Sequence, residues 1–181
     1  LGCRRLARLA KIASAARRVP APIAALTVGV ECGHSDATSG IASNRVIGAA
    51  ADRLVDLGAT VLVGETVEWL GAEHLLAARA RSPAVGAAIV AAVVARETAV
   101  AASGASLTGN NPGEENIRGG LSTIEEKALG AVAKTGSRPI DGLLALTERP
   151  PGPGLWLMDA PAFSPESLTG FAAVLMLWFL L

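Results

Sequence analysis

The chain has 181 residues, enough for one domain with a substantial core, and its acidic and basic side chains balance to a net charge of zero. This balance excludes the basic surface of a typical nucleic-acid-binding protein. Hydrophobic residues make up 51% of the chain but aromatic residues only 3%, and tyrosine is absent. The core must therefore consist of small aliphatic side chains, as in helices packed on a parallel sheet, and tyrosine is excluded as a general acid.

Neither end of the chain indicates secretion or membrane insertion. Cys3 and Cys32 are too few for a disulfide scaffold, so a cytoplasmic location is expected. The basic start, residues 1–8, is not followed by the apolar segment of a signal peptide. The apolar end, residues 171–181, is about half as long as a membrane helix, and we expect no membrane partner.

Hydrophobic periodicity and turn residues divide the chain into helices and strands. Residues 24–30 and 60–64 are short apolar runs typical of buried strands, and residues 83–102 are so apolar that we expect a helix packed on both sides. The predicted elements are helix 4–18, strand 24–30, helix 41–57 with Asn44 as cap, strand 60–64, helices 73–81 and 83–102, a helix from 122 to about 134, a short helical piece 140–146, strand 155–159, a helix from 164 and strand 174–181.

This order predicts a single α/β domain. The first strand, helix and second strand form a βαβ unit with a right-handed crossover. We expect a mostly parallel sheet with helices on both faces, a three-layer, Rossmann-like arrangement that is incomplete at the C-terminus. The basic face of helix 4–18 is interpreted as solvated surface rather than a site for an anion.

Reactive side chains crowd the segment 31–40, directly after the first strand. It offers a carboxylate, a thiol, an imidazole and a hydroxyl between Glu31 and Asp36. Further polar side chains follow the next strands, at residues 65–68 and at Asp159. The carboxyl ends of parallel strands lie at one edge of the sheet, where open α/β sheets bind ligands, so these clusters are expected to converge.

The alternative is that these residues only cap helices. That explanation suits Ser35 and Asp36 better than Cys32 or the two histidines, His34 and His74, which both fall in or near the clusters. Mixed imidazole, carboxylate and thiolate ligands suit iron, manganese or zinc better than calcium. No HExxH or CxxC spacing is present, so the pattern suggests a metal without specifying its ligands.

A long polar loop, residues 103–120, precedes the helix that begins near residue 122. It contains neither GxxxxGK[ST] nor GxGxxG, so it is not a nucleotide-binding loop. Its asparagines and backbone amides suit an anion such as a carboxylate. Lys127 and Lys134 lie two turns apart on that helix, and either is a candidate base if burial lowers its pKa, or both are solvated.

Four segments resemble the altronate and galactarate dehydratase family, which includes the large subunit of sulfolactate sulfo-lyase. They are ECGHSDATSGIASN, ETVEWLGAEHLL, NNPGEENIRGGLSTIEEKALGAVAKTG and GPGLWLMDAP. The resemblance implies a lyase for a small hydroxylated carboxylate, which removes water from a sugar acid such as altronate or galactarate to give a 2-keto-3-deoxy acid. It also implies a divalent metal, usually Fe²⁺, with Mn²⁺ as another possibility.

The resemblance suggests roles for residues of the four segments. Cys32, Glu73 and His74 would lie near the metal, and Lys127 or His34 would act as base, with Glu125 as a further catalytic candidate. The other implied residues are those that would bind the substrate: Ser35, Asp36, Asn116, Gly119, Gly120 and Asp159.

Two departures from the family pattern bear on function. His34 stands where the family often has glycine, which is more like the sulfo-lyase branch. Family members also continue far beyond residue 181, and the resemblance implies a missing N-terminal domain or small subunit as partner of residues 23–181, with residues 1–22 as a connection. Removal of sulfite from sulfolactate, and an inactive fragment that serves as an assembly domain and pairs with other chains or with itself, remain alternatives.

Overall fold

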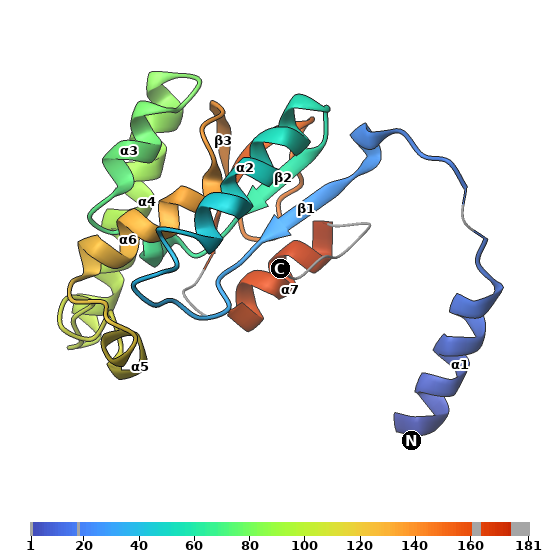
Figure 1. Ribbon diagram of the computed structural model, residues 1–181, viewed down its shortest axis with the longest axis horizontal. Coiled ribbons are helices and arrows are strands. Elements are labelled where there is room, and N and C mark those ends of the chain that lie inside the picture. Colours follow the sequence, from blue (N-terminus) through green and yellow to red (C-terminus); the bar gives the residue numbers. More distant parts are fainter. Residues whose placement is uncertain (1, 18, 161–163, 175–181) are drawn as a thin grey trace.

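The computed structural model describes residues 2–17, 19–160 and 164–174 of the chain (Figure 1). Its helices are α1 (Gly2–Ala15), α2 (Ser43–Asp56), α3 (Glu73–Ala78), α4 (Pro83–Ala102), α5 (Glu114–Arg118), α6 (Ile124–Val132) and α7 (Ser164–Val174). Three short 3-10 helices are η1 (Ile23–Ala25), η2 (Thr66–Trp69) and η3 (Ala133–Thr135). The strands are β1 (Thr27–Val30), β2 (Thr60–Val63), β3 (Ile140–Ala145) and β4 (Gly154–Asp159).

The four strands form one parallel sheet in the order β1-β2-β4-β3. Val30 of β1 pairs with Val63 of β2, and Val63 pairs with Leu157 of β4. Three strands therefore reach the same edge in register, and the residues that follow them meet there. This confirms the parallel α/β fold expected from the sequence.

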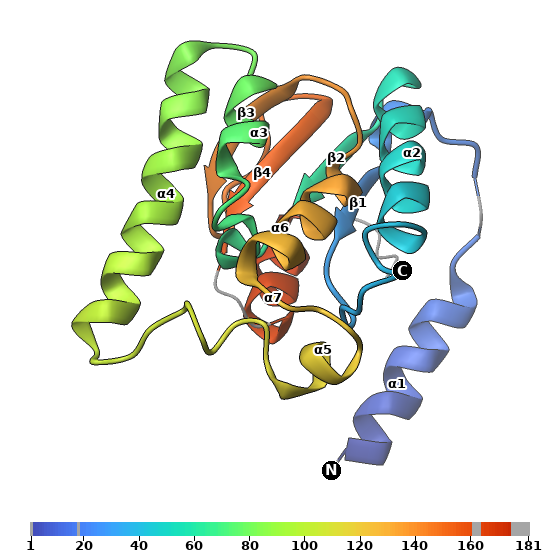
Figure 2. The same ribbon diagram turned by 60° about the vertical axis from the view of Figure 1, so that its left-hand side comes forward.

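Helices cover both faces of the sheet, as predicted (Figure 2). On one face, Val61 and Val63 pack against residues of α2, α4 and α6 in the main core. On the other face, Leu62 and Met158 pack against Phe171 of α7. Alternating strand residues thus enter separate cores, which is the three-layer arrangement that parallel sheets require.

The expected helical piece at residues 140–146 is wrong: the segment forms β3. Its side chains alternate between buried and more exposed positions, which is the period of a strand. Gly142 lies against Trp156 of β4, and a Cβ at this position would come within 2.6 Å of the indole ring. Tertiary packing across β3 and β4, which local periodicity does not reveal, decides the conformation here.

Two expectations about helices are also wrong. Asn44 does not cap α2 but lies inside it, where its side chain donates a hydrogen bond to the carbonyl of Gly130. The α4 helix is not packed on both sides as expected, because only Gly86, Ile89, Ala92 and Val93 are buried. By length and composition alone, α4 is long and apolar enough to cross a membrane. Its remaining faces are more open than its composition suggests, because alanine is small enough to stand on either side.

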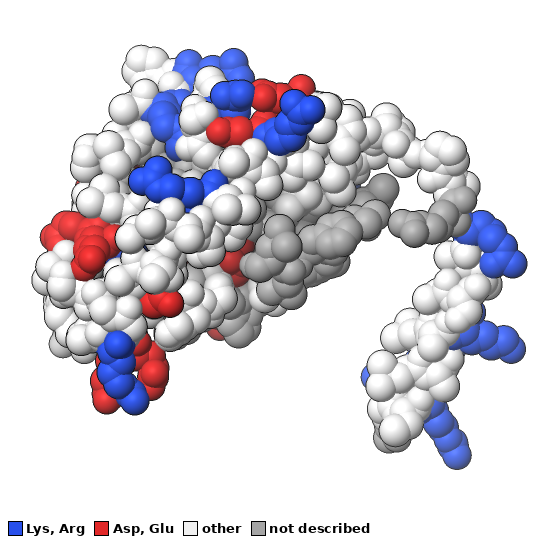
Figure 3. Space-filling model, in the orientation of Figure 1, with Lys and Arg blue, Asp and Glu red and all other residues white. Residues whose placement is uncertain are grey.

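Other terminal expectations are answered only in part. The helix from residue 164 is present as α7, which includes Val174. The rest of the expected strand 174–181 lies outside the described residues. At the other end, α1 contains no buried residue and stands apart from the sheet in both views, and its basic side chains project into solvent (Figure 3).

Candidate functional site

A thiol and two carboxylates meet where β1 and β2 end. Within the described residues, Cys32, Glu65 and Glu68 offer ligand atoms that all lie within 4.8 Å of one another. Glu65 and Glu68 are buried, and Cys32 is half-buried. The backbone N–H of Cys32 donates to Glu65 Oε2 at 2.8 Å, so the β1 loop and the β2 loop are joined directly.

The backbone after β2 directs both glutamates inward. Glu65 has φ 68° and ψ 61°, the left-handed conformation that is unfavourable for a residue with a Cβ. This turn leads into η2, in which every residue is buried, and the carboxylate of Glu68 comes to lie close to that of Glu65. Strained conformations of this kind persist where surrounding structure fixes them, and they are common at functional sites.

Lys134 neutralises the two carboxylates. Its side chain is 2% exposed, and Nζ donates to Glu65 Oε2 at 3.1 Å and to Glu68 Oε2 at 2.9 Å. Burial alone would lower the pKa of Lys134, but the negative charges of Glu68 and Glu65 raise it. The amine therefore stays protonated, and it does not have the lowered pKa that would make it a base.

The charges of the other members follow from the same contacts. Burial alone would raise the pKa of Glu68, but the nearby ammonium of Lys134 lowers it overall, so Glu68 stays ionised. Burial raises the pKa of the Cys32 thiol, and the charge of Glu68 adds to this effect. The thiol Sγ lies 3.2 Å from the hydroxyl Oγ of Ser35.

Glu31 is a further buried carboxyl beside this group. It is 7% exposed, and neither of its oxygens receives a hydrogen bond from a described residue. Burial, together with hydrogen bonding to Glu65 and the charge of Glu65, raises the pKa of Glu31 to about 10. The group is therefore protonated at neutral pH, and in that form it donates its proton to Glu65 rather than repelling it.

The protonation of Glu31 predicts a pH-dependent stability. Between pH 4.5 and about 10, folding takes up a proton at Glu31 because the unfolded carboxyl is ionised, so stability falls as the pH rises. Without metal, E31Q should be more stable than the native chain at pH 8 by up to about 5 kcal/mol and should lose this advantage below pH 4.5. Urea unfolding at pH 8 and below pH 4.5 measures the difference in free energy of unfolding between E31Q and the native chain. E97Q, at an exposed position on α4, is the control and should show no such difference. An equal effect at both pH values would contradict the prediction.

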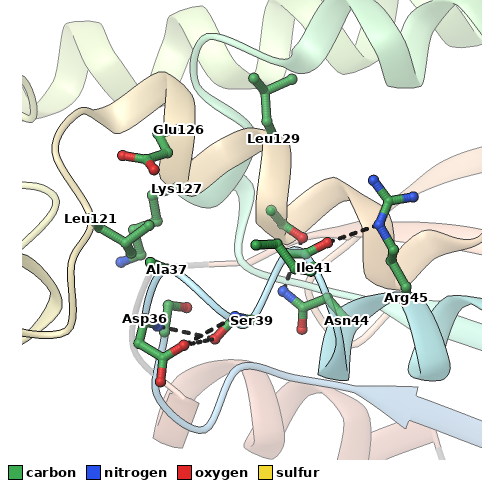
Figure 4. A pocket seen from close by; sticks show the side chains of 13 residues that line it. Asp36, Ala37, Ser39, Ile41, Asn44, Arg45, Leu121, Glu126, Lys127 and Leu129 are labelled. Atoms are coloured by element: carbon green, nitrogen blue, oxygen red, sulfur yellow. Dashed lines mark hydrogen bonds between the residues drawn. The ribbon is translucent and has the colours of Figure 1, made fainter.

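Lys127 connects the carboxylates to a cavity of about 230 Å³. Its Nζ donates to Asn111 Oδ1 at 2.8 Å and lies 3.6 Å from Glu68 Oε1. Figure 4 shows Lys127 extending from α6 toward the loop that carries Asp36 and Ala37. The lining residues are Ser35, Asp36, Ala37, Ser39, Gly40, Ile41, Asn44, Arg45, Leu121, Glu126, Lys127, Leu129 and Gly130.

Asp159 lies at the same edge of the sheet, at the end of β4. Its Oδ1 accepts hydrogen bonds from Thr66 Oγ1 at 2.8 Å and from Arg96 Nε at 3.0 Å. The ion pair with Arg96 fastens α4 to β4, and the threonine hydroxyl links β4 to the turn that carries Glu65 and Glu68. Asp159 thus helps to hold the turn that carries Glu65 and Glu68. Its expected role in substrate binding stays a prediction.

The donor set fits a divalent transition metal. A thiolate and two carboxylates suit Fe²⁺, Mn²⁺ or Zn²⁺. Lys134 uses one oxygen of each glutamate and leaves the second oxygen of each carboxylate for other partners. The residues present are therefore suitable to hold a metal, whose identity the donor set does not specify.

Comparison with known proteins identifies the family. The family described as D-galactarate/Altronate dehydratase, C-terminal, matches residues 23–178, which is most of the chain. The chain belongs to this family. The segments that carry the resemblance include α6, β4 and the residues that follow β1 and β2, among which are Cys32, Glu65 and Glu68.

Three curated relatives of the dehydratase family illustrate its range. The chain is 40% identical over 177 residues to (2R)-sulfolactate sulfo-lyase subunit beta of Chromohalobacter salexigens, covering 94% of this chain and 44% of that protein. It is 38% identical over 146 residues to galactarate dehydratase (L-threo-forming) of Escherichia coli, covering 81% and 28%. It is 33% identical over 165 residues to altronate dehydratase of Escherichia coli, covering 90% and 33%. The chain thus spans less than half the length of these relatives.

The structure does not bring Glu73 and His74 to Cys32. Both residues begin α3, where Glu73 Oε2 accepts a hydrogen bond from the N–H of Gly71 at 2.6 Å and His74 is exposed. Neither belongs to the described group of ligand atoms around Cys32. Of the expected metal ligands, the structure places Cys32 alone in that group, and Glu65 and Glu68 take the other two positions.

The expected catalytic residues also separate. Lys127 is half-buried, lies beside Glu68 and lines the cavity. His34 is exposed and does not line that cavity, and Glu125 lines a neighbouring cavity beside Asn111. Lys127 is therefore the candidate that the geometry supports, while roles for His34 and Glu125 stay predictions.

Of the expected substrate-binding residues, those of the β1 loop and of the turn at α5 lie against each other, whereas Asp159 contacts Thr66 and Arg96. Ala37 N–H donates to Gly119 O at 3.0 Å, and Asn116 Nδ2 donates to Ser35 O at 2.8 Å, so the turn at α5 lies against the β1 loop. The N–H groups of Gly119 and Gly120, however, donate to carbonyls within the same turn. The amide donors of Gly119 and Gly120 are therefore already used, and neither glycine lines the cavity beside Lys127.

The sequence pattern named the region of Glu65 and Glu68 but did not select them as ligands. The sequence does contain one indication: two acidic residues three positions apart follow a fully apolar strand directly, which favours burial of both side chains. Lys134, named only as a possible base, is the counterpart of this pair. Its spacing of two turns from Lys127 puts both amines on the side of α6 and η3 that faces Glu68.

Proposed function

We propose that this chain carries the metal site and part of the catalytic site of a sugar-acid dehydratase. The observation that carries the proposal is the group Cys32, Glu65 and Glu68 at the carboxyl edge of the sheet, next to a cavity with Lys127 in its wall. Membership of the dehydratase family supports elimination of water as the reaction. The proposed substrates are altronate or galactarate, and the proposed metal is Fe²⁺ or Mn²⁺.

The chemistry requires a base and stabilisation of an enediolate. A proton next to a carboxylate is weakly acidic, so its removal must be coupled to stabilisation of the charge that develops. A bound divalent metal supplies this by polarising the substrate carboxylate and a hydroxyl. Cys32, Glu65 and Glu68 would hold the metal at the bottom of the β1 and β2 loops.

Lys127 is the proposed base. In its neutral form its amine takes the proton from the carbon beside the carboxylate. The ammonium so formed gives that proton to the hydroxyl that leaves the next carbon, so that water departs, and the resulting enol becomes a 2-keto acid. Asn111 Oδ1 fixes the position of Nζ at 2.8 Å, which limits the amine to one side of the cavity. Leu121 and Leu129 form apolar parts of the wall around the reacting carbons.

A second candidate is cleavage of sulfolactate to pyruvate and sulfite. It is favoured by 40% identity over 94% of the chain to a sulfo-lyase subunit. The same base removes the same type of proton in both reactions, but sulfite leaves without needing a proton. Because the two reactions share their first step, the residues around Lys127 do not separate them.

Product analysis separates the two candidates. The chain, supplied with Fe²⁺ or Mn²⁺, is incubated with altronate, galactarate or sulfolactate, and 2-keto acid and sulfite are measured. We expect 2-keto acid from a sugar acid, no sulfite, and loss of turnover in EDTA. Sulfite release without dehydration would establish the second candidate instead, and turnover of no substrate by the metal-loaded chain would contradict both.

A further inference from the structure

Lys134 occupies the position of a cation between two buried carboxylates. It donates to one oxygen of Glu65 and one of Glu68, at 3.1 and 2.9 Å. The backbone around it is fixed, because Arg79 Nη1 donates to the hydroxyl of the next residue, Thr135, at 2.7 Å and Nη2 to its carbonyl at 3.0 Å. Lys134 therefore stays in place without any bound ion.

Two carboxylates this close cannot both stay ionised in a buried site unless a cation balances them. A metal that is needed for folding usually provides that balance itself, and such sites are unfolded without the metal. Here Lys134 already provides this balance within the chain, through its contacts with both Glu65 and Glu68.

We propose that Lys134 is a built-in counter-ion that competes with the divalent metal, so that the metal is exchangeable and the metal-free chain stays folded. This rests on the proposed function for the identity of the site. A dication held by Cys32 and the remaining glutamate oxygens would lie within a few ångströms of the ammonium, and the two positive charges repel each other strongly in a buried site. Lys134 thus keeps the ligands together and at the same time weakens the metal affinity.

The test removes the charge of Lys134 while the metal ligands are kept. K134M removes charge and hydrogen bonds, whereas K134Q keeps donors for both carboxylates without the charge. Mn²⁺ binding is followed by the electron paramagnetic resonance signal of free Mn²⁺, and thermal unfolding is measured in EDTA and in Mn²⁺. We expect at least about tenfold tighter Mn²⁺ binding in both variants, and a larger rise of Tm with Mn²⁺ than in the native chain.

Two controls isolate the effect of the charge. K134R keeps a cation at the same position and should keep the native affinity, and K11Q removes a cation from the exposed helix α1 and should change nothing. If K134M folds only with Mn²⁺, that result supports the proposal, and K134Q then provides the affinity. Equal or weaker Mn²⁺ binding in K134Q than in the native chain overturns it.

The result is independent of catalysis. Tighter Mn²⁺ binding in K134Q supports the inference even if the native chain turns over no substrate, an outcome that would overturn the proposed function alone. Conversely, a metal-dependent native enzyme whose affinity does not increase in K134Q overturns the inference and leaves the proposed function in place.

Discussion

Replacement of Glu68 by glutamine is expected to lower Mn²⁺ affinity by more than about 100-fold, because even residues that only support metal ligands contribute 10- to 100-fold. E68Q keeps the shape of the side chain but removes a carboxylate ligand and a partner of Lys134, which is 2% exposed. Metal-dependent turnover should fall with the affinity. The loss of a buried ionic partner should also destabilise the fold, by about 3 kcal/mol, since Glu65 still balances Lys134.

Three measurements check this prediction: Mn²⁺ binding, turnover over a range of Mn²⁺ concentrations, and urea unfolding in EDTA. E97Q makes the same chemical change at an exposed glutamate on α4 and should leave all three unchanged. If E68Q binds Mn²⁺ with native affinity, Glu68 is not a ligand.

Replacement of Gly136 by alanine is expected to destabilise the fold by about 4 kcal/mol, through backbone strain and the loss of hydrogen bonds. Gly136 has φ 65° and ψ −147°, a region for glycine, and an added Cβ would lie 2.2 Å from Asp52 Oδ1. Asp52 accepts hydrogen bonds from the N–H groups of Ser137 and Arg138, so it cannot move away without losing them. G136A therefore strains the segment directly after Lys134.

Thermal unfolding measures the effect of G136A, and Tm should fall by roughly 10 °C for a domain of this size. G152A is the matched control, because an added Cβ at Gly152 meets no atom within 4 Å. Its effect should remain within about 0.5 kcal/mol. A G136A chain that unfolds at the same temperature as G152A would show that this turn is not fixed in solution.

Much of the fold followed from local patterns in the sequence. The strands at Val61 and Leu157 are continuous apolar runs, and Ser82 before Pro83 marks the start of α4, where its hydroxyl accepts a hydrogen bond from Val85 N–H. The segment of β3 was missed because Gly142 and Leu143 carry no strand preference of their own. Contact with Trp156 of the neighbouring strand determines its conformation.

The sequence predicted the location of the candidate site but not which side chains contact one another within it. Strand ends indicated the edge of the sheet at which Cys32, Glu65 and Glu68 meet, and Lys127 lies beside Glu68 there. His74 was favoured because histidine is a common ligand type, but α3 places it at the surface. Which side chains face one another depends on the left-handed turn at Glu65, and no residue type in the sequence predicts glutamate in that conformation.

The turn at Glu65 has a consequence for how this position tolerates change. Its backbone, at φ 68°, favours glycine or asparagine, whereas Lys134 and the N–H of Cys32 both require an acceptor at the end of a longer side chain. Selection for a heat-resistant chain and selection for a working catalyst should thus favour different residues at position 65. The native glutamate thus provides a charge at the cost of a strained backbone, which is an example of the trade-off between stability and activity.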